Sequence, residues 1–508
     1  MHRITDLTRA PHSLLFPAPA ALTAVLAPVF VGALVCALLS GCAVGPDYTR
    51  PKTVNGDIFK EASMEREDAD WAVARPGMVD QSSWWTVFRD PALNALMPQL
   101  AAANPNIAVA RANLEQARAT VREATAFFFP TIKGSGDIGR ARQRGSGPGN
   151  TYRAQLSASW ELDIFGGARR ALEASMITTE ATEADLAAMM LSMRAELAQN
   201  YFQLRSLDEQ KELYVKTVAA YGKSLDITRN QHAAGVVTRL DVAQAETQLK
   251  SAQAQAIDID LQRRQTEHAI AALLGLPPSL FFLSPGALSD AHLPKIAAAL
   301  PSTLMERRPD IAAAERRMAA ANARIGVAKS AYYPVFSLTG SGGYTGTEFR
   351  DWFILPNRIW SVGASLAQSI FEGGKLMART DQAIAAWEAA TATYRKTVLD
   401  AFREVEDQLA AATLLADEEA IQLEALAWAR DAENLAISQY QGGIVTYLTV
   451  VSAQTTALAN ARTAATLRGR RFMTAVALVR SLGGGWEPPF HDSPQTPKAD
   501  REQGAAAQ

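Results

Sequence analysis

Residues 152–167 read YRAQLSASWELDIFGG, and apolar and polar side chains alternate from Tyr152 to Asp163 and on to Ile164. Successive side chains of a β-strand point to opposite faces, so this period of two predicts a strand with one apolar face and one polar face. A second alternating segment runs from Trp360 to Ile370, and a shorter alternating segment precedes each of the two. We therefore expect four strands in two hairpins, with glycine-rich and polar turns inside each hairpin.

The segments around these strands occur twice. The matching pairs are NPNI at 104–107 with RPDI at 308–311, FFP at 128–130 with YYP at 332–334, DIFGG at 163–167 with SIFEG at 369–373, GVVT at 235–238 with GIVT at 443–446, and LG at 274–275 with LG at 482–483. The offset is 204 residues for the first two pairs, 206 for the third and 208 for the last two. Because the matches keep their order and drift so little, they indicate a tandem duplication.

Each copy surrounds its hairpin with helices. Alanine-rich stretches without proline, at 106–127 and 311–331, predict a helix that a proline then ends. Residues 168–231 contain no proline and repeat apolar residues at spacings of three and four, which predicts a helix roughly 96 Å long. A second helix at 239–274 runs back, so the two form an antiparallel hairpin, and the second copy repeats this arrangement around Gly442 and Gly443.

The N-terminus has the features of a lipoprotein signal. Arg3 and Arg9 precede an apolar run at 18–39, which ends in LSGC at residues 39–42. Cleavage before Cys42 would leave that cysteine as the lipid anchor, and Ala43 after it favours the outer membrane. A transmembrane anchor is the alternative, because the run is long enough to span a bilayer. The only other cysteine lies inside the signal, so the mature chain has no disulfide.

These features divide the chain into six parts. They are the signal peptide (1–41), a lipid-anchored N-terminal segment (42–103), the first repeat (104–275), a linker (276–307), the second repeat (308–486) and a flexible, proline-containing tail (487–508) without an assigned function.

Composition and motifs give no support for an enzyme or a nucleic-acid-binding protein. The formal net charge is -2, so no basic field attracts nucleic acid. His232, His268, His292 and His491 are isolated from one another, and no phosphate-binding loop is present. We expect no catalytic residue, no metal site and no cofactor.

Four two-faced strands cannot close a membrane barrel alone, because such a barrel needs about eight strands or more. The chain must therefore assemble with copies of itself, and three copies would supply twelve strands. The long helices carry charges throughout and must project into water. A soluble helical bundle with a small sheet is the alternative that these patterns leave open.

Several motifs resemble the outer membrane efflux protein family, in its lipoprotein branch. They are GPDYTRP at 45–51, WWTVFRDPAL at 84–93, LPS at 300–302, ERRPDI at 306–311 and LGGGW at 482–486. The resemblance implies an α+β membrane protein: a homotrimer with a twelve-stranded β-barrel in the outer membrane, continued by a long periplasmic α-helical barrel. It also implies a passive channel that works with a periplasmic adaptor protein and an inner-membrane transporter.

The resemblance also assigns roles at the turns of the two helical hairpins. The adaptor-docking tips would be Gly235, Val236 and Thr238 in copy one and Gly443, Ile444 and Thr446 in copy two. The periplasmic gate would include Leu240, Asp241, Leu448, Thr449 and Ser452.

Simple helix capping is the alternative for the tip glycines and for Asp241. The second copy departs from the family pattern, because many relatives carry aspartate at the position of Ser452, and some also at that of Thr449. We therefore expect Leu448 to act as an apolar plug and the gate to bind cations weakly. A coiled-coil scaffold and an enzyme with a dispersed site remain alternatives, and the transported substrate stays open.

Overall fold

A computed structural model describes residues 43–51, 59–61, 71–73, 81–142, 147–288, 291–298 and 307–486. Cys42, the signal, the LPS motif at 300–302 and the C-terminal tail lie outside these residues. The chain divides into two compact units, and both copies contribute to each. The sheet unit contains residues 1–47, 124–172 and 323–382, and the helical unit contains residues 48–123, 173–322 and 383–508.

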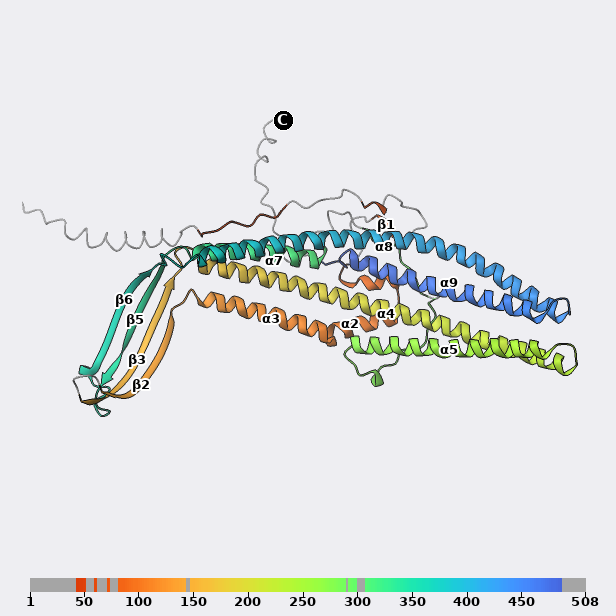
Figure 1. The fold of residues 1–508 in the computed structure, drawn as a ribbon, viewed down its shortest axis with the longest axis horizontal. Coiled ribbons are helices and arrows are strands. Elements are labelled where there is room, and N and C mark those ends of the chain that lie inside the picture. Colours follow the sequence, from red (N-terminus) through yellow and green to blue (C-terminus); the bar gives the residue numbers. More distant parts are fainter. Residues whose placement is uncertain are drawn as a thin grey trace, which may run out of the picture. The chain divides into compact units, whose positions relative to one another are not determined.

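The sheet unit holds the four predicted strands. These are β2 (Thr131–Arg142), β3 (Pro148–Leu162), β5 (Val335–Gly346) and β6 (Arg358–Ala367), all antiparallel and in the order β2-β3-β5-β6 (Figure 1). The hairpin of copy one therefore joins the hairpin of copy two through the pairing of β3 with β5. Strands β2 and β6 remain as the two edges of the sheet.

The strand register places most polar side chains on one face of the sheet and most large apolar side chains on the other. Residues that are directly paired share a face. One face carries Thr131, Lys133, Ser135, Asp137, Arg153, Gln155, Ser157, Ser159, Glu161, Ser337, Thr339, Ser341, Ser361 and Ser365. The opposite face carries Ile132, Ile138, Tyr152, Leu156, Trp160, Leu162, Phe336, Leu338, Tyr344, Trp360, Val362 and Leu366. The alternation in the sequence is thus confirmed as one polar and one apolar surface.

Both β3 and β6 end earlier than the alternation predicts, and β6, with 10 residues, is shorter than its partner β5, with 12, although the alternation predicted the reverse. Ile164 lies beyond the end of β3, and Ile370 lies beyond the end of β6 at 98% exposure. In copy one, Asp163 turns the chain out of the sheet, because its carboxylate accepts hydrogen bonds from the backbone N–H groups of Ala168 (3.0 Å) and Arg169 (2.9 Å). The carboxylate thereby caps the following helix. In copy two, Gly373 and Gly374 make the turn with φ of 58° and 86°.

The turn between β5 and β6 is not the glycine-rich, polar turn that we predicted. It contains Phe349, Trp352 and Phe353, which form ring contacts with one another and with strand tyrosines. Tyr152 contacts Phe349 and Trp352 with centroids 5.7 and 5.8 Å apart, and Tyr344 contacts Phe353 at 5.5 Å. Because both tyrosines are on the apolar face, this aromatic loop packs at the edge of that face.

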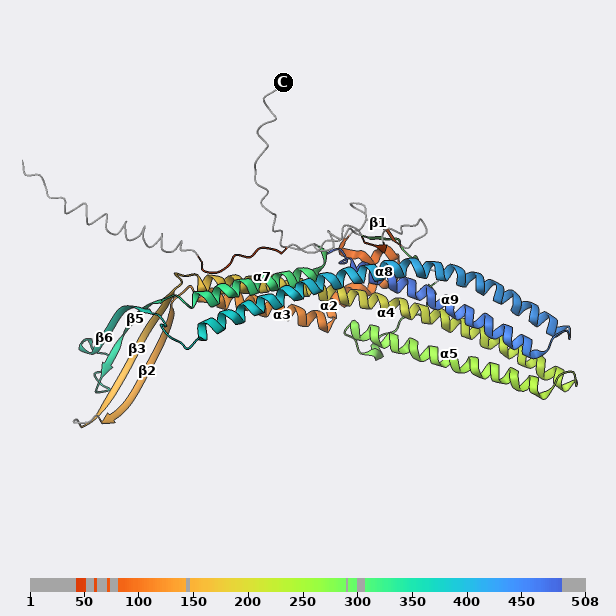
Figure 2. The ribbon, with the colours of Figure 1, turned by 45° about the horizontal axis from the view of Figure 1, so that its top comes forward.

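The helices show the duplication directly, since corresponding helices have equal lengths. α3 (Pro105–Ala126) and α7 (Pro309–Ser330) have 22 residues, α4 (Gly167–Ala233) and α8 (Lys375–Gln441) have 67, and α5 (Arg239–Leu273) and α9 (Tyr447–Ser481) have 35. α5 returns along α4, and α9 returns along α8 (Figures 1 and 2). Of the helices in the described residues, none is both long and apolar enough to cross a membrane.

The two helical hairpins share one core. Phe202 of α4 and Phe472 of α9 have ring centroids 4.9 Å apart, and the ring of Phe88 lies tilted against that of Phe202 with centroids 4.8 Å apart. Phe88 belongs to the short 3-10 helix η2 (Gln81–Phe88), which precedes α2 (Pro91–Ala103). The aromatic residues of the WWTVF motif are thus core residues.

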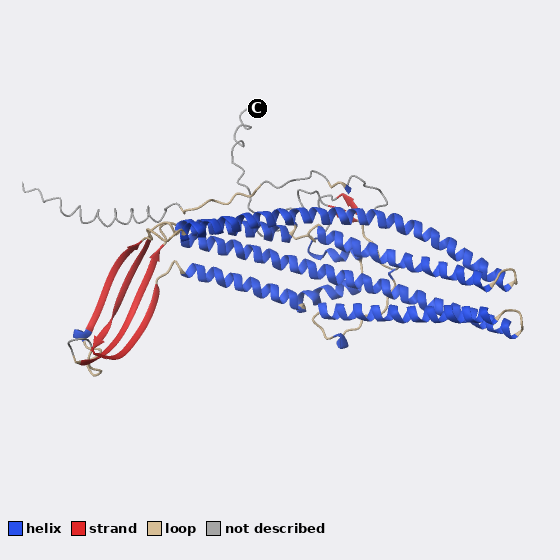
Figure 3. Ribbon diagram, viewed as in Figure 1, coloured by secondary structure: helices blue, strands red, loops and turns tan. Residues whose placement is uncertain are grey.

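The N-terminal segment and the linker also pair in the helical unit. β1 (Trp71–Val73) and β4 (Ile296–Ala298) form a small parallel sheet, visible among the helices in Figure 3. This sheet was not predicted. Each strand has only three residues, which is too short for a period of two to be recognised.

Candidate functional site

The two hairpin tips have the same backbone structure. At the first tip Gly235 has a φ of 75°, and the N–H of Val236 donates to the carbonyl of Gln231 at 2.9 Å. At the second tip Gly443 has a φ of 71°, and the N–H of Ile444 donates to the carbonyl of Gln439 at 2.9 Å. These are glycine-capped helix ends, in which the positive φ favours glycine. The capping alternative therefore describes the backbone correctly.

Capping does not account for the side chains at the tips. Val236 and Ile444 are 70% and 76% exposed, and Leu240 and Leu448 are 66% and 59% exposed. Each pair occupies equivalent positions of the two copies, 208 residues apart. Both copies therefore present the same two apolar side chains to the surroundings. Exposed apolar side chains that recur in this way mark a candidate interaction surface.

The helix starts after the two tips differ. Thr238 caps α5, and its hydroxyl accepts a hydrogen bond from the N–H of Asp241 at 3.3 Å. The Asp241 carboxylate in turn accepts from the backbone N–H of Thr238 at 2.9 Å, which completes a capping box. Thr446 caps α9 without a side-chain hydrogen bond. The residue equivalent to Asp241 is Thr449, which is exposed, as is Ser452.

A small apolar cluster joins the two hairpins next to the tips. Its buried members are Leu225, Ala245, Ala436, Tyr440, Tyr447 and Val450, which come from α4, α5, α8 and α9. The rings of Tyr440 and Tyr447 meet edge to face with centroids 5.3 Å apart. Burial raises the pKa of Tyr447 to about 12. The cluster holds the two tips of one chain together.

A buried network of charges was missed by the sequence reasoning. The Arg263 guanidinium lies 2.6 Å from one carboxylate oxygen of Asp208, and the Arg205 guanidinium lies 3.3 Å from the other. Arg263 also donates to the carbonyl of Leu283 at 2.7 Å, and Arg205 donates to that of Ser284 at 2.6 Å. The network thereby fastens the start of the linker to α4 and α5. The only signal for this network in the sequence was that its charged residues are spaced three or four positions apart, as residues on the buried face of a helix are.

The residues that follow Cys42 are fixed against the sheet unit. The N–H of Val44 donates to the carbonyl of Phe165 at 3.2 Å, and Asp47 pairs with Arg170 at 2.7 Å. A Cβ on Gly166 would lie 2.8 Å from the Cα of Ala43. The chain next to Cys42 therefore runs close to the end of β3, where Phe165 stacks on Tyr333 at 4.6 Å.

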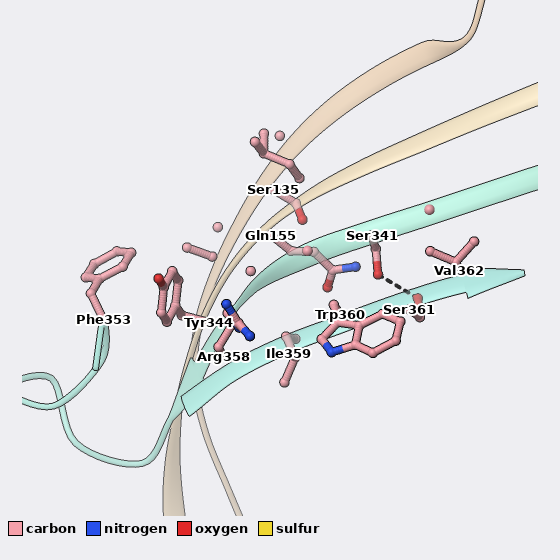
Figure 4. Close-up of a pocket in the computed structure, with 17 residues that line it drawn as sticks. Ser135, Gln155, Ser341, Tyr344, Phe353, Arg358, Ile359, Trp360, Ser361 and Val362 are labelled. Carbon is pink, nitrogen blue, oxygen red and sulfur yellow. Dashed lines mark hydrogen bonds between the residues drawn. The ribbon is translucent and has the colours of Figure 1, made fainter. Parts of the chain in front are cut away.

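The sheet has a hollow near its aromatic loop. All four strands line this hollow of about 1090 Å³, with segments 134–136, 154–156, 340–344 and 358–362 and with Phe353 (Figure 4). Glycines at 134, 136, 340, 342 and 343 leave much of the backbone there uncovered. In Figure 4, Tyr344 and Arg358 lie side by side between Phe353 and the rest of the hollow. No group of three His, Cys, Asp or Glu side chains within the described residues is placed to hold a metal ion.

Comparison with known proteins identifies this architecture. The family model described as Outer membrane efflux protein matches residues 96–276 and 300–484. The pyoverdine export outer membrane protein OpmQ of Pseudomonas aeruginosa is 32% identical over 466 residues, which are 89% of this chain and 96% of OpmQ.

Solved structures of outer-membrane channels have the same fold. The channel OprN superimposes with a TM-score of 0.80 at 32% identity, over 88% of this chain and 100% of OprN. The channel MtrE of Neisseria gonorrhoeae, in its open state, gives a TM-score of 0.77 at 26% identity, over 88% and 99% of the two chains. The predicted family and fold class are thus confirmed. This chain belongs to the outer membrane efflux protein family.

Proposed function

We propose that three copies of this chain form the outer-membrane duct of a tripartite efflux system. The observation that carries the proposal is the two-faced sheet with two unpaired edges. A sheet in a membrane must have its edge strands paired, because unpaired N–H and C=O groups are costly in lipid. β2 and β6 run antiparallel to each other, so β6 of one subunit can pair with β2 of the next. Three subunits then close a barrel with the serine- and threonine-rich face inward.

The helical hairpins supply the periplasmic part of the duct in this proposal. Val236, Leu240, Ile444 and Leu448 form the apolar surface that docks on a periplasmic adaptor or narrows the passage. Gly235 and Gly443, with Thr238 and Thr446, set the shape of each tip. Leu240 and Leu448, with Asp241, Thr449 and Ser452, line the gate. An inner-membrane transporter provides the energy, and the duct itself conducts passively.

The lipid on Cys42 anchors the N-terminus in the same membrane. Support comes from the segment that follows it, since Val44 and Asp47 are bonded to residues next to the end of β3. An anchor there would sit at the same level as the Phe165–Tyr333 stack. Aromatic side chains at such a level suit the border between lipid and water.

The relatives do not assign a substrate. Proteins of 30–32% identity are named for pyoverdine export, toluene efflux and antibiotic efflux. In this family arrangement the pump selects the cargo, and the duct admits what the pump delivers.

Reconstitution in planar bilayers tests the proposal. Purified chain should migrate as a trimer and give discrete conductance steps, because a closed twelve-stranded barrel encloses water. A trimer without conductance would favour the coiled-coil scaffold, and a monomer in native mass spectrometry would contradict the barrel. Replacement of Cys42 by Ser should leave the sheet intact and abolish lipid labelling of the chain.

A further inference from the structure

Three arginines interrupt the apolar face of the sheet, all at the same end. Pairing puts Arg140 two residues beyond the Ile138–Tyr152 pair, Arg142 two residues further on, and Arg358 directly opposite Tyr344. All three side chains are exposed. The acidic residues of the paired strands, Asp137 and Glu161, are on the other face.

The three guanidinium groups are not neutralised by the described part of the chain. Among the residues that the structure describes, no carboxylate forms an ion pair with Arg140, Arg142 or Arg358. The nearby loop contributes two exposed carboxylates, Glu348 and Asp351, and neither is paired with these arginines. This end of the apolar face therefore carries net positive charge.

The position of the arginines along the strand matches the border of a lipid layer. From Leu162 to Tyr152, ten residues of β3 cover about 34 Å of strand, which at a tilt of about 40° gives roughly 26 Å of height. That is close to the apolar band of about 25 Å on membrane barrels. Arg140 and Arg142 lie beyond this band, and Arg358, opposite Tyr344 and thus level with Ala154, lies at its border next to the aromatic loop. Aromatic side chains at this level are typical of the headgroup region.

The order of the strands brings the arginines of two subunits together. Arg140 and Arg142 end one edge strand, β2, and Arg358 begins the other edge strand, β6. Within one subunit these residues are on opposite edges of the sheet, and Arg358 is level with Gly136, four residues before Arg140. Closure of a barrel of tilted strands staggers the register, and a stagger of about four to six residues where β6 of one subunit pairs with β2 of the next would bring the three arginines together.

Connectivity decides which leaflet this end of the sheet faces. The strands join the helices through residues 127–130, 163–166, 331–334 and 368–374, all at the opposite end of the sheet. If the helices are periplasmic, the arginines lie at the outer leaflet. Guanidinium groups bind phosphate oxygens through paired, charge-assisted hydrogen bonds.

We infer that Arg358 of one subunit and Arg140 and Arg142 of the next form a composite site for the phosphate groups of outer-leaflet lipids, one site at each subunit junction. The inference rests on the proposed trimer. The lipid phosphate neutralises the arginines, its acyl chains cover the apolar face, and the bound lipid bridges two subunits. Lipid binding then stabilises the trimer as well as orienting it.

The test compares lipid binding by purified trimers in detergent. Diphosphorylated lipid A is the probe, and native mass spectrometry counts the bound molecules. In the triple variant Arg140→Gln, Arg142→Gln, Arg358→Gln, the affinity for lipid A should fall by at least about tenfold. The control is Arg153→Gln, which removes one arginine charge near the same end from the polar face, where Arg153 pairs in register with Asp137; the single variant Arg140→Gln is its charge-matched counterpart on the apolar face. The Arg153→Gln control should bind lipid A as the wild type does.

Several results would overturn the composite site. The first is binding of lipid A by the triple variant as strong as that by the wild type, and the second is a loss of binding in the Arg153→Gln control as large as that in the triple variant. The third is displacement of lipid A by inorganic phosphate when both supply the same concentration of phosphate groups. Conductance of the same samples separates the two proposals. A conducting wild-type trimer whose lipid binding ignores the three arginines refutes only the site. A chain that forms no trimer refutes the duct, and the composite site with it.

Discussion

Asp241 accepts two hydrogen bonds from Thr238, one from the backbone N–H at 2.9 Å and one from the hydroxyl at 2.7 Å. The carboxylate proposed for the gate is therefore also part of a helix cap. Capping and cation binding were alternatives in the sequence, and the structure shows that this side chain is engaged in the first. Thr449, at the equivalent position, lacks the carboxylate that such a box needs.

Replacing Thr449 with Asp should rebuild the box in the second copy. The first turn of α9 should gain about 0.5–1 kcal/mol, because an acidic side chain at this position bonds to the Thr446 N–H. Hydrogen exchange of residues 447–452 should slow. Divalent cations should block the channel current in bilayers more strongly, because each gate would then carry twice as many carboxylates. The wild type should show weak block, and strong block would contradict its low gate acidity.

Two variants of the first copy separate the roles of Asp241. Asp241→Asn removes the charge, whereas Thr238→Ala leaves the charge and breaks the box. If the carboxylate attracts cations, only Asp241→Asn should weaken the block of the channel current by divalent cations. Equal effects of both variants on block would mean that helix capping is the whole role of Asp241.

Gly443→Val should abolish export and leave trimers intact. Valine at a φ of 71° is strained by about 1–2 kcal/mol, so the tip must change shape. Nothing lies within 4 Å of a Cβ added at this position, so the change stays local. Export is measured by drug or dye retention in cells, and trimers by gel electrophoresis.

Gly222→Ala is the control for the glycine variant. Gly222 lies inside α4 and also has nothing within 4 Å of an added Cβ, but its φ is not positive. Alanine there should stabilise the helix by up to about 1 kcal/mol and preserve export. Normal export by Gly443→Val would contradict the docking role of the tips.

Asp208→Asn should destabilise the helical unit strongly. Its side chain is 3% exposed, and the substitution leaves Arg263, 6% exposed, without its closest counter-charge. Breaking such a buried pair costs about 3–5 kcal/mol. Thermal unfolding of the trimer measures the effect.

Asp260→Asn is the matched control for Asp208→Asn. Asp260 also pairs with two basic residues, Lys211 and Arg264, but it is 29% exposed. Its loss should cost about 1 kcal/mol or less. Similar losses from the two variants would show that burial does not strengthen the Asp208 network.

Stability should fall with rising pH through the titration of Glu433. Burial raises the pKa of this carboxyl, and the charge of Arg430 only partly offsets the effect. Glu433 lines a cavity of about 190 Å³ together with Tyr221 and Gln454. Among the described residues, the Tyr221 hydroxyl and the Gln454 amide oxygen have no hydrogen-bond partner.

The sign follows from proton binding. Above its ordinary pKa of 4.5 the unfolded carboxyl has lost its proton, while the folded one still holds it, so folding is favoured below the raised pKa and loses that advantage above it. Glu433→Gln should therefore unfold at a higher temperature than wild type at pH 7.5, with a smaller difference at pH 5. Glu424→Gln, an exposed site on the same helix, controls for the lost charge. An unfolding temperature for Glu433→Gln at or below that of the wild type at pH 7.5 would contradict the prediction.

The sequence by itself determined the duplication, the four long strands, the helices of the two repeats and the two faces of the sheet. These follow from local signals: a period of two in β3, spacings of three and four in α4, prolines that end α3 and α7, and glycines at both tips. Such signals depend on neighbours within a few residues, so one sequence is sufficient to see them. The family motifs added the assembly and the partners as expectations.

Only the tertiary structure decided which strands pair, where they end and which charges meet. The pairing of β3 with β5 joins residues 174 to 194 positions apart, and nothing local encodes that register. The Asp208–Arg263 pair and the Tyr440–Tyr447 contact arise in the same way, from packing of separate helices. The arginines of β2 and β6 look like scattered surface charges in the sequence. The fold places them on the two edges of one sheet, near the same end and on the same face, which is what lets the proposed trimer bring them together.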